Sequence, residues 1–303
     1  MSPPPDRTVP PSLHAADPPE LARVAFVLVG TSHPGNVGSA ARAMKTMGLA
    51  DLRLVAPRFA DVCDRADARA FASGAGDRLD SARHFATLDE ALADVALAVA
   101  VSAEPREFGP PPAPPEDCAA DAFAVLEAAP AHRVAFVFGA ERTGLSILEV
   151  QACGRLLSIP ASPVYSSLNL AQALQIVAYS LRREALARVA RGRLAQLPPR
   201  TAAGAGQGSR GDGDGDEGVG AGIAVGEPAA GDEPGARLAS QRAVQGLLDH
   251  LERSLRTIGF LDPQHPKKLM PRLRRLFLRA RLRTEEVDLL RGVCTSMERD
   301  ERR

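Results

Sequence analysis

Short runs of apolar, often β-branched residues recur through the first half of the chain. The runs cover residues 24–30, 51–57, 95–103, 134–140 and 156–160. They are continuous rather than alternating, which favours strands that are covered on both faces. Segments with helical character lie between them, at about residues 37–47, 88–93, 117–129 and 146–153. Strands that alternate with helices predict an α/β domain, with a parallel sheet and helices on both faces.

Helical spacing dominates the second half of the chain. A long helix is predicted over about residues 167–190, and its apolar stripe contains Ala171, Leu174, Ala178 and Leu181. Two further apolar faces follow, made by Leu247, Leu248, Leu251, Leu255 and Ile258 and by Leu269, Leu273, Leu276 and Phe277. Thr284 stands where it can cap a third helix. These patterns predict a small all-helical C-terminal domain.

Composition sets the expected domain boundaries. Residues 1–20 are rich in proline and predict a disordered tail, whereas residues 21–195 hold the α/β pattern. Residues 196–236 are dominated by Gly, Ala, Asp and Pro and predict a flexible acidic linker. Residues 237–303 then form the helical domain.

Charge is unevenly distributed along a chain whose formal net charge is zero. Residues 237–303 carry sixteen Lys or Arg against nine acids, an excess of seven positive charges. Such a basic domain favours a polyanionic partner, although a solvated helical surface would show the same excess. Aromatic residues make up only 4%, without tryptophan, so contacts with nucleic acid should depend on charge, backbone amides and shape.

Cysteine usage and hydropathy exclude several classes of protein. The four cysteines are widely spaced, with no C-x-x-C pair and no histidine at zinc-ligand spacing, which predicts a reduced cytoplasmic protein without a metal. The acidic stretch at residues 212–218 resembles a calcium loop, but Glu217 stands where the turn glycine belongs. No apolar run is long enough to cross a membrane.

Residues 30–49 form the first segment that can carry chemistry. Gly30, Gly35 and Gly38 are expected to allow a tight strand-to-helix turn, whose amides could hold a phosphate. Asn36-Val37 replaces the Lys-Ser/Thr pair of a P-loop, so nucleotide hydrolysis is not predicted. From spacing alone, the simpler interpretation of Arg42 is a solvated surface arginine.

Two later segments share this arrangement of strand, turn and helix. In residues 136–146, Gly139 stands at the end of a predicted strand and is followed by Glu141 and by Gly144-Leu145. A glycine at the end of a strand lets a ligand approach the backbone closely. Residues 158–174 place Ser166, Ser167 and Asn169 before a helix, where they could equally be helix-capping residues. Each segment alone is compatible with an ordinary junction between elements.

Together the three segments resemble the motifs of the SpoU branch of the SPOUT methyltransferases, over about residues 24–183. The matching residues are Asn36, Gly38 and Arg42, then Phe138, Gly139, Glu141, Gly144 and Leu145, then Ile159, Pro160, Ser167, Leu168 and Asn169. The surroundings of the first and third motifs resemble the TrmJ subgroup, which methylates the ribose of nucleotide 32 in the tRNA anticodon loop. The basic stretch at residues 259–282 resembles the helical extension of that subgroup.

The resemblance implies a C-terminal trefoil knot in the α/β domain, a homodimer and the cofactor S-adenosyl-L-methionine. It places the cofactor among Val101, Ser102, Ala103, Gly139, Ile159, Ser166, Ser167 and Leu168. The implied partner is tRNA, and neither a metal nor a membrane is implied. A ribosomal RNA substrate, or a non-catalytic RNA-binding protein on the same scaffold, are the alternatives.

The resemblance also assigns roles around the transferred methyl group. It makes Arg42 the catalytic residue, and because a guanidinium stays protonated, we expect Arg42 to anchor the adjacent phosphate and stabilise the developing alkoxide. Asn36 would orient Arg42 or the ribose, and Glu141 would position Arg42. Ser167 and Asn169 would fix the target nucleotide.

Overall fold

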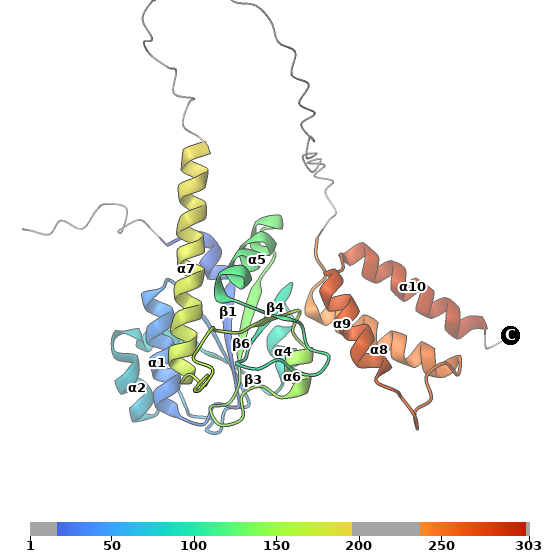
Figure 1. Ribbon diagram of the computed structural model, residues 1–303, viewed down its shortest axis with the longest axis horizontal. Helices are drawn as coiled ribbons and strands as arrows, with labels where there is room; N and C mark the ends of the chain where they lie inside the picture. Colours follow the sequence, from blue (N-terminus) through green and yellow to red (C-terminus); the bar gives the residue numbers. More distant parts are fainter. Residues whose placement is uncertain (1–16, 196–236, 301–303) are drawn as a thin grey trace, which may run out of the picture.

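The computed structural model describes residues 17–195 and 237–300, as an α/β domain and a helical C-terminal module (Figure 1). The chain is already structured at the 3₁₀ helix η2 (Pro19–Arg23), two residues before the expected start of the domain. The rest of the predicted tail and the predicted linker at 196–236 lie outside the described residues.

One parallel sheet of seven strands forms the centre of the α/β domain, in the order β3-β2-β1-β6-β4-β7-β5. The strands are β1 (Val24–Val29), β2 (Asp51–Val55), β3 (Arg83–Phe85), β4 (Leu97–Val101), β5 (Pro112–Ala113), β6 (Val134–Phe138) and β7 (Arg155–Leu157). β1 and β6 are buried along their whole length, as continuous apolar strands predict. The sequence did not predict the edge strands β3 and β5, which are too short to show a periodic pattern.

Helices cover both faces of this sheet, which confirms the predicted architecture. One face carries α1 (Pro34–Thr46), α2 (Ala66–Ala72), α3 (Gly76–Asp80), α5 (Pro115–Ala128) and α7 (Leu170–Ala195). The other carries the short helices α4 (Leu88–Leu92) and α6 (Ile147–Gln151). α2 and α3 were not predicted. The threading of the chain into a trefoil knot stays a prediction.

Glycines near the first motif serve two different purposes. Gly30 has a φ of +60°, so the predicted tight turn after β1 requires it. Gly38 lies inside α1, where a Cβ would stand 2.1 Å from the carbonyl oxygen of Ala68. Gly35 and Gly38 both lie inside α1, so of the three glycines only Gly30 shapes the turn, and Gly38 instead allows α1 to pack closely against α2.

The C-terminal module contains α8 (Gln241–Thr257), α9 (Leu269–Ala280) and α10 (Thr284–Asp300) around a small apolar core. Two residues of the predicted apolar faces are exposed in the structure. Ile258 lies just beyond the end of α8, and the side chain of Leu276 is 46% exposed. Thr284 is the first residue of α10, and its hydroxyl donates to the carbonyl of Arg237. Thr284 therefore does not cap α10, and its hydrogen bond joins the start of α10 to Arg237 at the start of the module.

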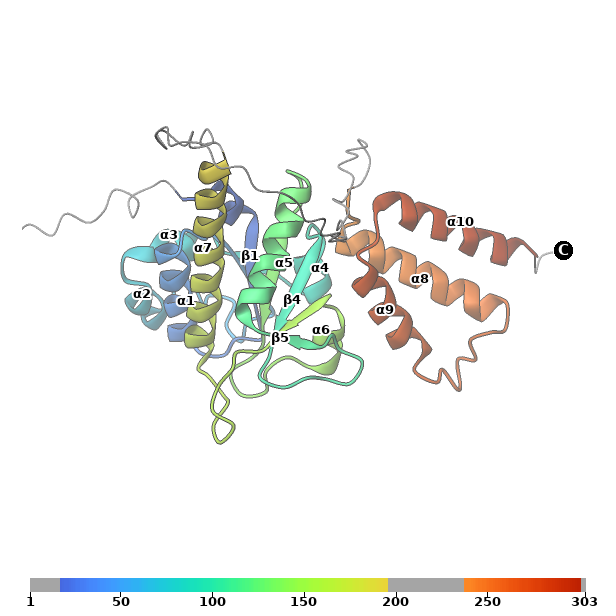
Figure 2. The same cartoon turned by 45° about the horizontal axis from the view of Figure 1, so that its top comes forward.

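The C-terminal module lies beside the α/β domain (Figure 2), and two of its backbone amides donate hydrogen bonds to that domain. The amide of Gln241 donates to the carbonyl of Val95 at 2.9 Å, and the amide of Leu238 donates to Nε2 of His132 at 3.1 Å. His132 is 2% exposed, and its Nδ1–H donates to the carbonyl of Val125. The buried imidazole therefore links the two domains through both of its ring nitrogens.

Within the described residues, all four cysteines are free and buried, and no cluster of three or more His, Cys, Asp or Glu could hold a metal ion. None of the helices in this part of the chain is long and apolar enough to span a membrane.

Candidate functional site

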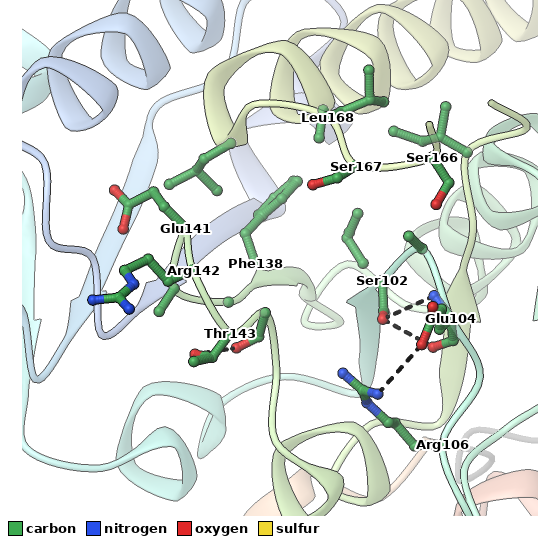
Figure 3. A pocket seen from close by; sticks show the side chains of 18 residues that line it. Ser102, Glu104, Arg106, Phe138, Glu141, Arg142, Thr143, Ser166, Ser167 and Leu168 are labelled. Carbon is green, nitrogen blue, oxygen red and sulfur yellow. Dashed lines mark hydrogen bonds and ion pairs between the residues drawn. The ribbon is translucent and has the colours of Figure 1, made fainter. Parts of the chain in front are cut away.

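A cavity of about 300 Å³ opens at the carboxyl ends of β4, β6 and β7, the edge where parallel α/β sheets bind ligands. Three segments line it: residues 101–106 after β4, residues 138–144 after β6, and residues from 159 to 173 around the start of α7. Figure 3 shows their side chains gathered around the opening. The structure places all eight cofactor residues expected from the sequence in this wall.

Gly139 is required where β6 meets the turn that follows it. A Cβ at this position would lie 2.2 Å from the carbonyl carbon of Gly144 and 2.3 Å from the nitrogen of Leu145. Gly144 itself has a φ of +64°, and its amide donates to the carbonyl of Ala140 at 2.8 Å. Backbone therefore packs directly on backbone, and this side of the cavity is a rigid wall of peptide groups.

The opposite wall offers free peptide groups to a ligand. Within the described residues, no hydrogen bond engages the backbone N–H or C=O groups of Ser166, Ser167 and Leu168. These residues precede α7, and their side chains are exposed beside the cavity. Free amides and carbonyls of this kind suit the edge of an adenine ring and the polar end of an amino acid.

A chain of hydrogen bonds joins the three motifs. The Glu141 carboxylate accepts from the Asn36 amide at 3.1 Å and from the backbone N–H and hydroxyl of Ser32, both at 2.9 Å. The Asn36 carbonyl oxygen in turn accepts from the Asn169 side-chain amide at 3.1 Å. Asn169 also caps α7, because its Oδ1 accepts from the amide of Ala171. Segments far apart in the sequence are thus fixed to one another at the rim of the cavity.

Glu141 is held ionised by these donors. Burial alone would raise its pKa, but the hydrogen bonds from the Ser32 backbone and the Asn36 side chain outweigh burial and lower the pKa to about 2. The carboxylate therefore stays charged throughout the neutral range and keeps its hydrogen bonds with residues 31–36.

Replacing Glu141 by glutamine should destabilise the protein by about 1–2 kcal/mol at pH 7 and by much less at pH 3. A carboxyl whose pKa is lower in the folded than in the unfolded chain stabilises the fold above the unfolded pKa. That contribution disappears as the pH falls from about 4.5 towards about 2. Urea unfolding of both proteins at several pH values measures it, with Glu104→Gln as a control that removes another carboxylate of the cavity. A difference that is constant with pH would contradict this role.

Within one chain, Glu141 does not contact Arg42, so its predicted role in positioning Arg42 stays a prediction. Its two oxygens are occupied by donors from residues 31–36, and no hydrogen bond or ion pair reaches Arg42 within the described part of the chain. Arg42 follows Asn36 by six residues in α1, a rotation of about 240° around the helix, so the two side chains point in different directions. Arg42 is exposed and does not line the cavity.

The cavity also contains residues that the sequence did not single out. Arg106 lies in its wall, with one guanidinium nitrogen 3.8 Å from Glu104 and another 3.5 Å from the carbonyl of Leu145. Arg142 and Thr143 line it after Glu141. The loop after β4 has no periodic pattern, so nothing in the sequence marked Arg106. By contrast, the sequence could have marked Thr31, Ser32 and His33, which donate hydrogen bonds to Glu141, because they form a polar run directly after a buried strand.

The fold and this cavity define an α/β protein that binds a ligand at the carboxyl ends of parallel strands. Residues 23–179 match the model of the SpoU rRNA Methylase family, and residues 242–303 match the model of the tRNA methyltransferase TrmJ C-terminal domain. The chain therefore belongs to the SpoU methylase family.

Individual relatives match over nearly the whole chain. The tRNA (cytidine/uridine-2'-O-)-methyltransferase TrmJ of Klebsiella pneumoniae is 39% identical, over 92% of this chain and 97% of the relative. The tRNA (cytidine/uridine/adenosine-2'-O-)-methyltransferase TrmJ of Pseudomonas aeruginosa is also 39% identical, over 92% and 95%. The crystal structure of TrmJ from Z. mobilis ZM4 superposes with a TM-score of 0.65 at 30% identity, covering 91% of this chain and all of that one.

Proposed function

We propose that this protein transfers a methyl group from S-adenosyl-L-methionine to a ribose 2′-oxygen of tRNA. The observation that carries the proposal is the cavity at the strand ends, where Gly139 and the free peptide groups of residues 166–168 face each other. Relatives that match along both domains and are named as tRNA 2′-O-methyltransferases support the same reaction.

The residues of the cavity fit the cofactor. Gly139, Ile159 and the backbone of residues 166–168 would hold the adenosine and methionine parts, and residues 101–103 would close the opposite side. When bound there, S-adenosyl-L-methionine supplies an electrophilic methyl group. The side chains of this chain then have to bring a ribose hydroxyl into line with that group and stabilise its oxygen as the proton leaves.

Arg42 supplies that stabilisation in our proposal. Its guanidinium remains protonated, so it binds the phosphate next to the target ribose and stabilises negative charge on the 2′-oxygen, while the phosphate or water accepts the proton. Ser167 contacts the target nucleotide. Asn36, Glu141 and Asn169 are positioning residues, because their hydrogen bonds fix the segments that carry the other groups.

We further propose that the target is nucleotide 32 of the anticodon loop. Incubation with labelled cofactor and either total tRNA or ribosomal RNA, followed by digestion and nucleoside mass analysis, tests both the substrate and the position. Methylated cytidine or uridine from tRNA, mapped to position 32, is the expected product. Label in ribosomal RNA alone would replace tRNA as the substrate, and no label in either would end the enzymatic proposal.

We also infer that the protein works as a homodimer in the cytoplasm. Val164 is 92% exposed and Tyr165 is 78% exposed, and both precede residues that line the cavity. Arg42, the proposed catalytic residue, does not line the cavity of its own chain. A second copy would cover these apolar side chains and could supply the missing guanidinium. Light scattering coupled to size-exclusion chromatography measures the mass, and a monomer at micromolar concentration would contradict the proposal.

A further inference from the structure

A second cavity, of about 410 Å³, lies between the α/β domain and the C-terminal module. Its walls come from the loop after β4, the α6–β7 junction and α9, three neighbouring parts of the structure in Figure 2. The lining residues that matter here are four arginines, Arg155 on the α/β side and Arg275, Arg279 and Arg281 on the module. We refer to this space as the arginine cavity.

The arginine cavity has an excess of positive charge. Among the described residues no acidic side chain lines it. Asp121 pairs with Arg155 at 2.5 Å and with Arg281 at 3.4 Å, and Glu107, next to the lining residue Phe108, pairs with Lys268. Arg275 and Arg279 are exposed, and neither makes a hydrogen bond or ion pair within the described residues. Within the described part of the chain, one carboxylate, that of Asp121, pairs with two of the four guanidinium groups, which leaves an excess of three positive charges.

Arg155 adds a donor that the chain does not satisfy. Its Nε is shielded from solvent and has no hydrogen-bond partner among the described residues. A buried donor without an acceptor is unfavourable, and Asp121 Oδ2, in the same ion pair, is also without a hydrogen-bond partner among the described residues. Phe108, Pro110, Pro111 and Leu278 form the apolar part of the remaining wall, and Gln151, Cys153 and Gly154 complete it.

We propose that the arginine cavity binds a backbone phosphate of the RNA substrate. Forked guanidinium groups bind phosphate oxygens in pairs, and such contacts fix the register of a nucleic acid without reading its sequence. The inference rests on the proposed function, because it takes the polyanion to be the RNA that is methylated. It assigns part of RNA binding to a site shared by the two domains, and not to the basic surface of the module alone.

The loop after β4 connects this site to the cofactor cavity. Its first half, residues 101–106, lines the cofactor cavity, and its second half lines the arginine cavity through Phe108, Pro110 and Pro111. Lys268 pairs with Glu107, and the guanidinium of Arg272 lies 5.7 Å from the centre of the Phe108 ring. An RNA strand with a phosphate in the arginine cavity is therefore held beside the loop that borders the cofactor.

The test is the double variant Arg275→Ala/Arg279→Ala in the full chain. We expect its affinity for tRNA to fall about tenfold, and the slope of log affinity against log salt concentration to decrease by about 1 for each phosphate that the variant no longer binds. Arg275→Lys/Arg279→Lys keeps the charge but not the fork, so it should recover only part of the affinity. Cofactor titration without RNA should give the wild-type affinity in both variants.

A matched control removes the same charge elsewhere on the module. Arg253 on α8 and Arg299 on α10 are exposed and do not line the arginine cavity, so Arg253→Ala/Arg299→Ala should change the affinity less than about twofold. Equal affinities of the two double variants would overturn the proposal, since only general charge would then matter. Binding is measured separately from methyl transfer: a wild-type protein that binds tRNA but never methylates it refutes the proposed function and leaves the phosphate site standing.

Discussion

Replacing Arg42 by alanine is expected to lower the rate of methyl transfer by about 10²–10³-fold while cofactor affinity stays unchanged. The rate falls because the guanidinium stabilises charge that develops on the 2′-oxygen, and removal of one such donor typically costs that much. Cofactor affinity stays because Arg42 does not line the cofactor cavity and makes no hydrogen bond or ion pair within the described residues.

Single-turnover transfer from labelled cofactor to tRNA measures the effect, and calorimetric titration with the cofactor provides the control. Arg42→Lys should also be slow, because a lysine cannot reproduce the planar fork. A rate near that of the wild type in either variant would remove Arg42 from the mechanism. Mixing the Arg42→Ala chain with a chain that cannot bind cofactor then shows which cavity Arg42 serves, since recovered activity assigns it to the cavity of a partner copy.

Replacing Gly139 by alanine is expected to reduce cofactor affinity by at least about 100-fold. The added Cβ would lie 2.2 Å from the carbonyl carbon of Gly144, far inside the contact distance of about 3.5 Å between carbon atoms. The obstacle is backbone, so the turn after β6 has to move, and with it one wall of the cofactor cavity. Overpacking of this kind also costs about 1–3 kcal/mol of stability.

Calorimetric titration and thermal unfolding of Gly139→Ala measure these two effects. Gly74→Ala is the control, because a Cβ at Gly74 meets no atom within 4 Å and this glycine does not have a positive φ. It should bind cofactor like the wild type. Wild-type affinity in a folded Gly139→Ala protein would mean that the cofactor binds elsewhere.

The sequence predicted the elements that are long and continuously apolar. The strands at β1 and β6 and the helices α5 and α7 were found because burial imposes a pattern over many residues. The two-residue strand β5 pairs only because β7 lies beside it, a tertiary fact that leaves no local pattern. The packing role of Gly38 was missed for a related reason, since only the packed structure shows that α2 touches α1 at that point.

The cofactor wall was predictable only through the resemblance, because its residues contribute mainly backbone, which composition and periodicity do not distinguish. The contacts that side chains make in the site could not be predicted from the sequence. Glu141 was expected to reach Arg42, yet its oxygens face the turn at residues 31–36. The arginine cavity was not foreseen, because it combines Arg155 with residues of a helix more than a hundred positions away.

The loop after β4 borders both cavities, and this arrangement has a thermodynamic consequence. Because Phe108 belongs to the same loop as Ser102 and Arg106, we expect a phosphate bound in the proposed site to change the cofactor cavity as well. By reciprocity, the factor by which tRNA changes cofactor affinity equals the factor by which the cofactor changes tRNA affinity. With a phosphate site at one end of this loop and the cofactor at the other, the affinities of a small molecule and a nucleic acid are expected to depend on each other.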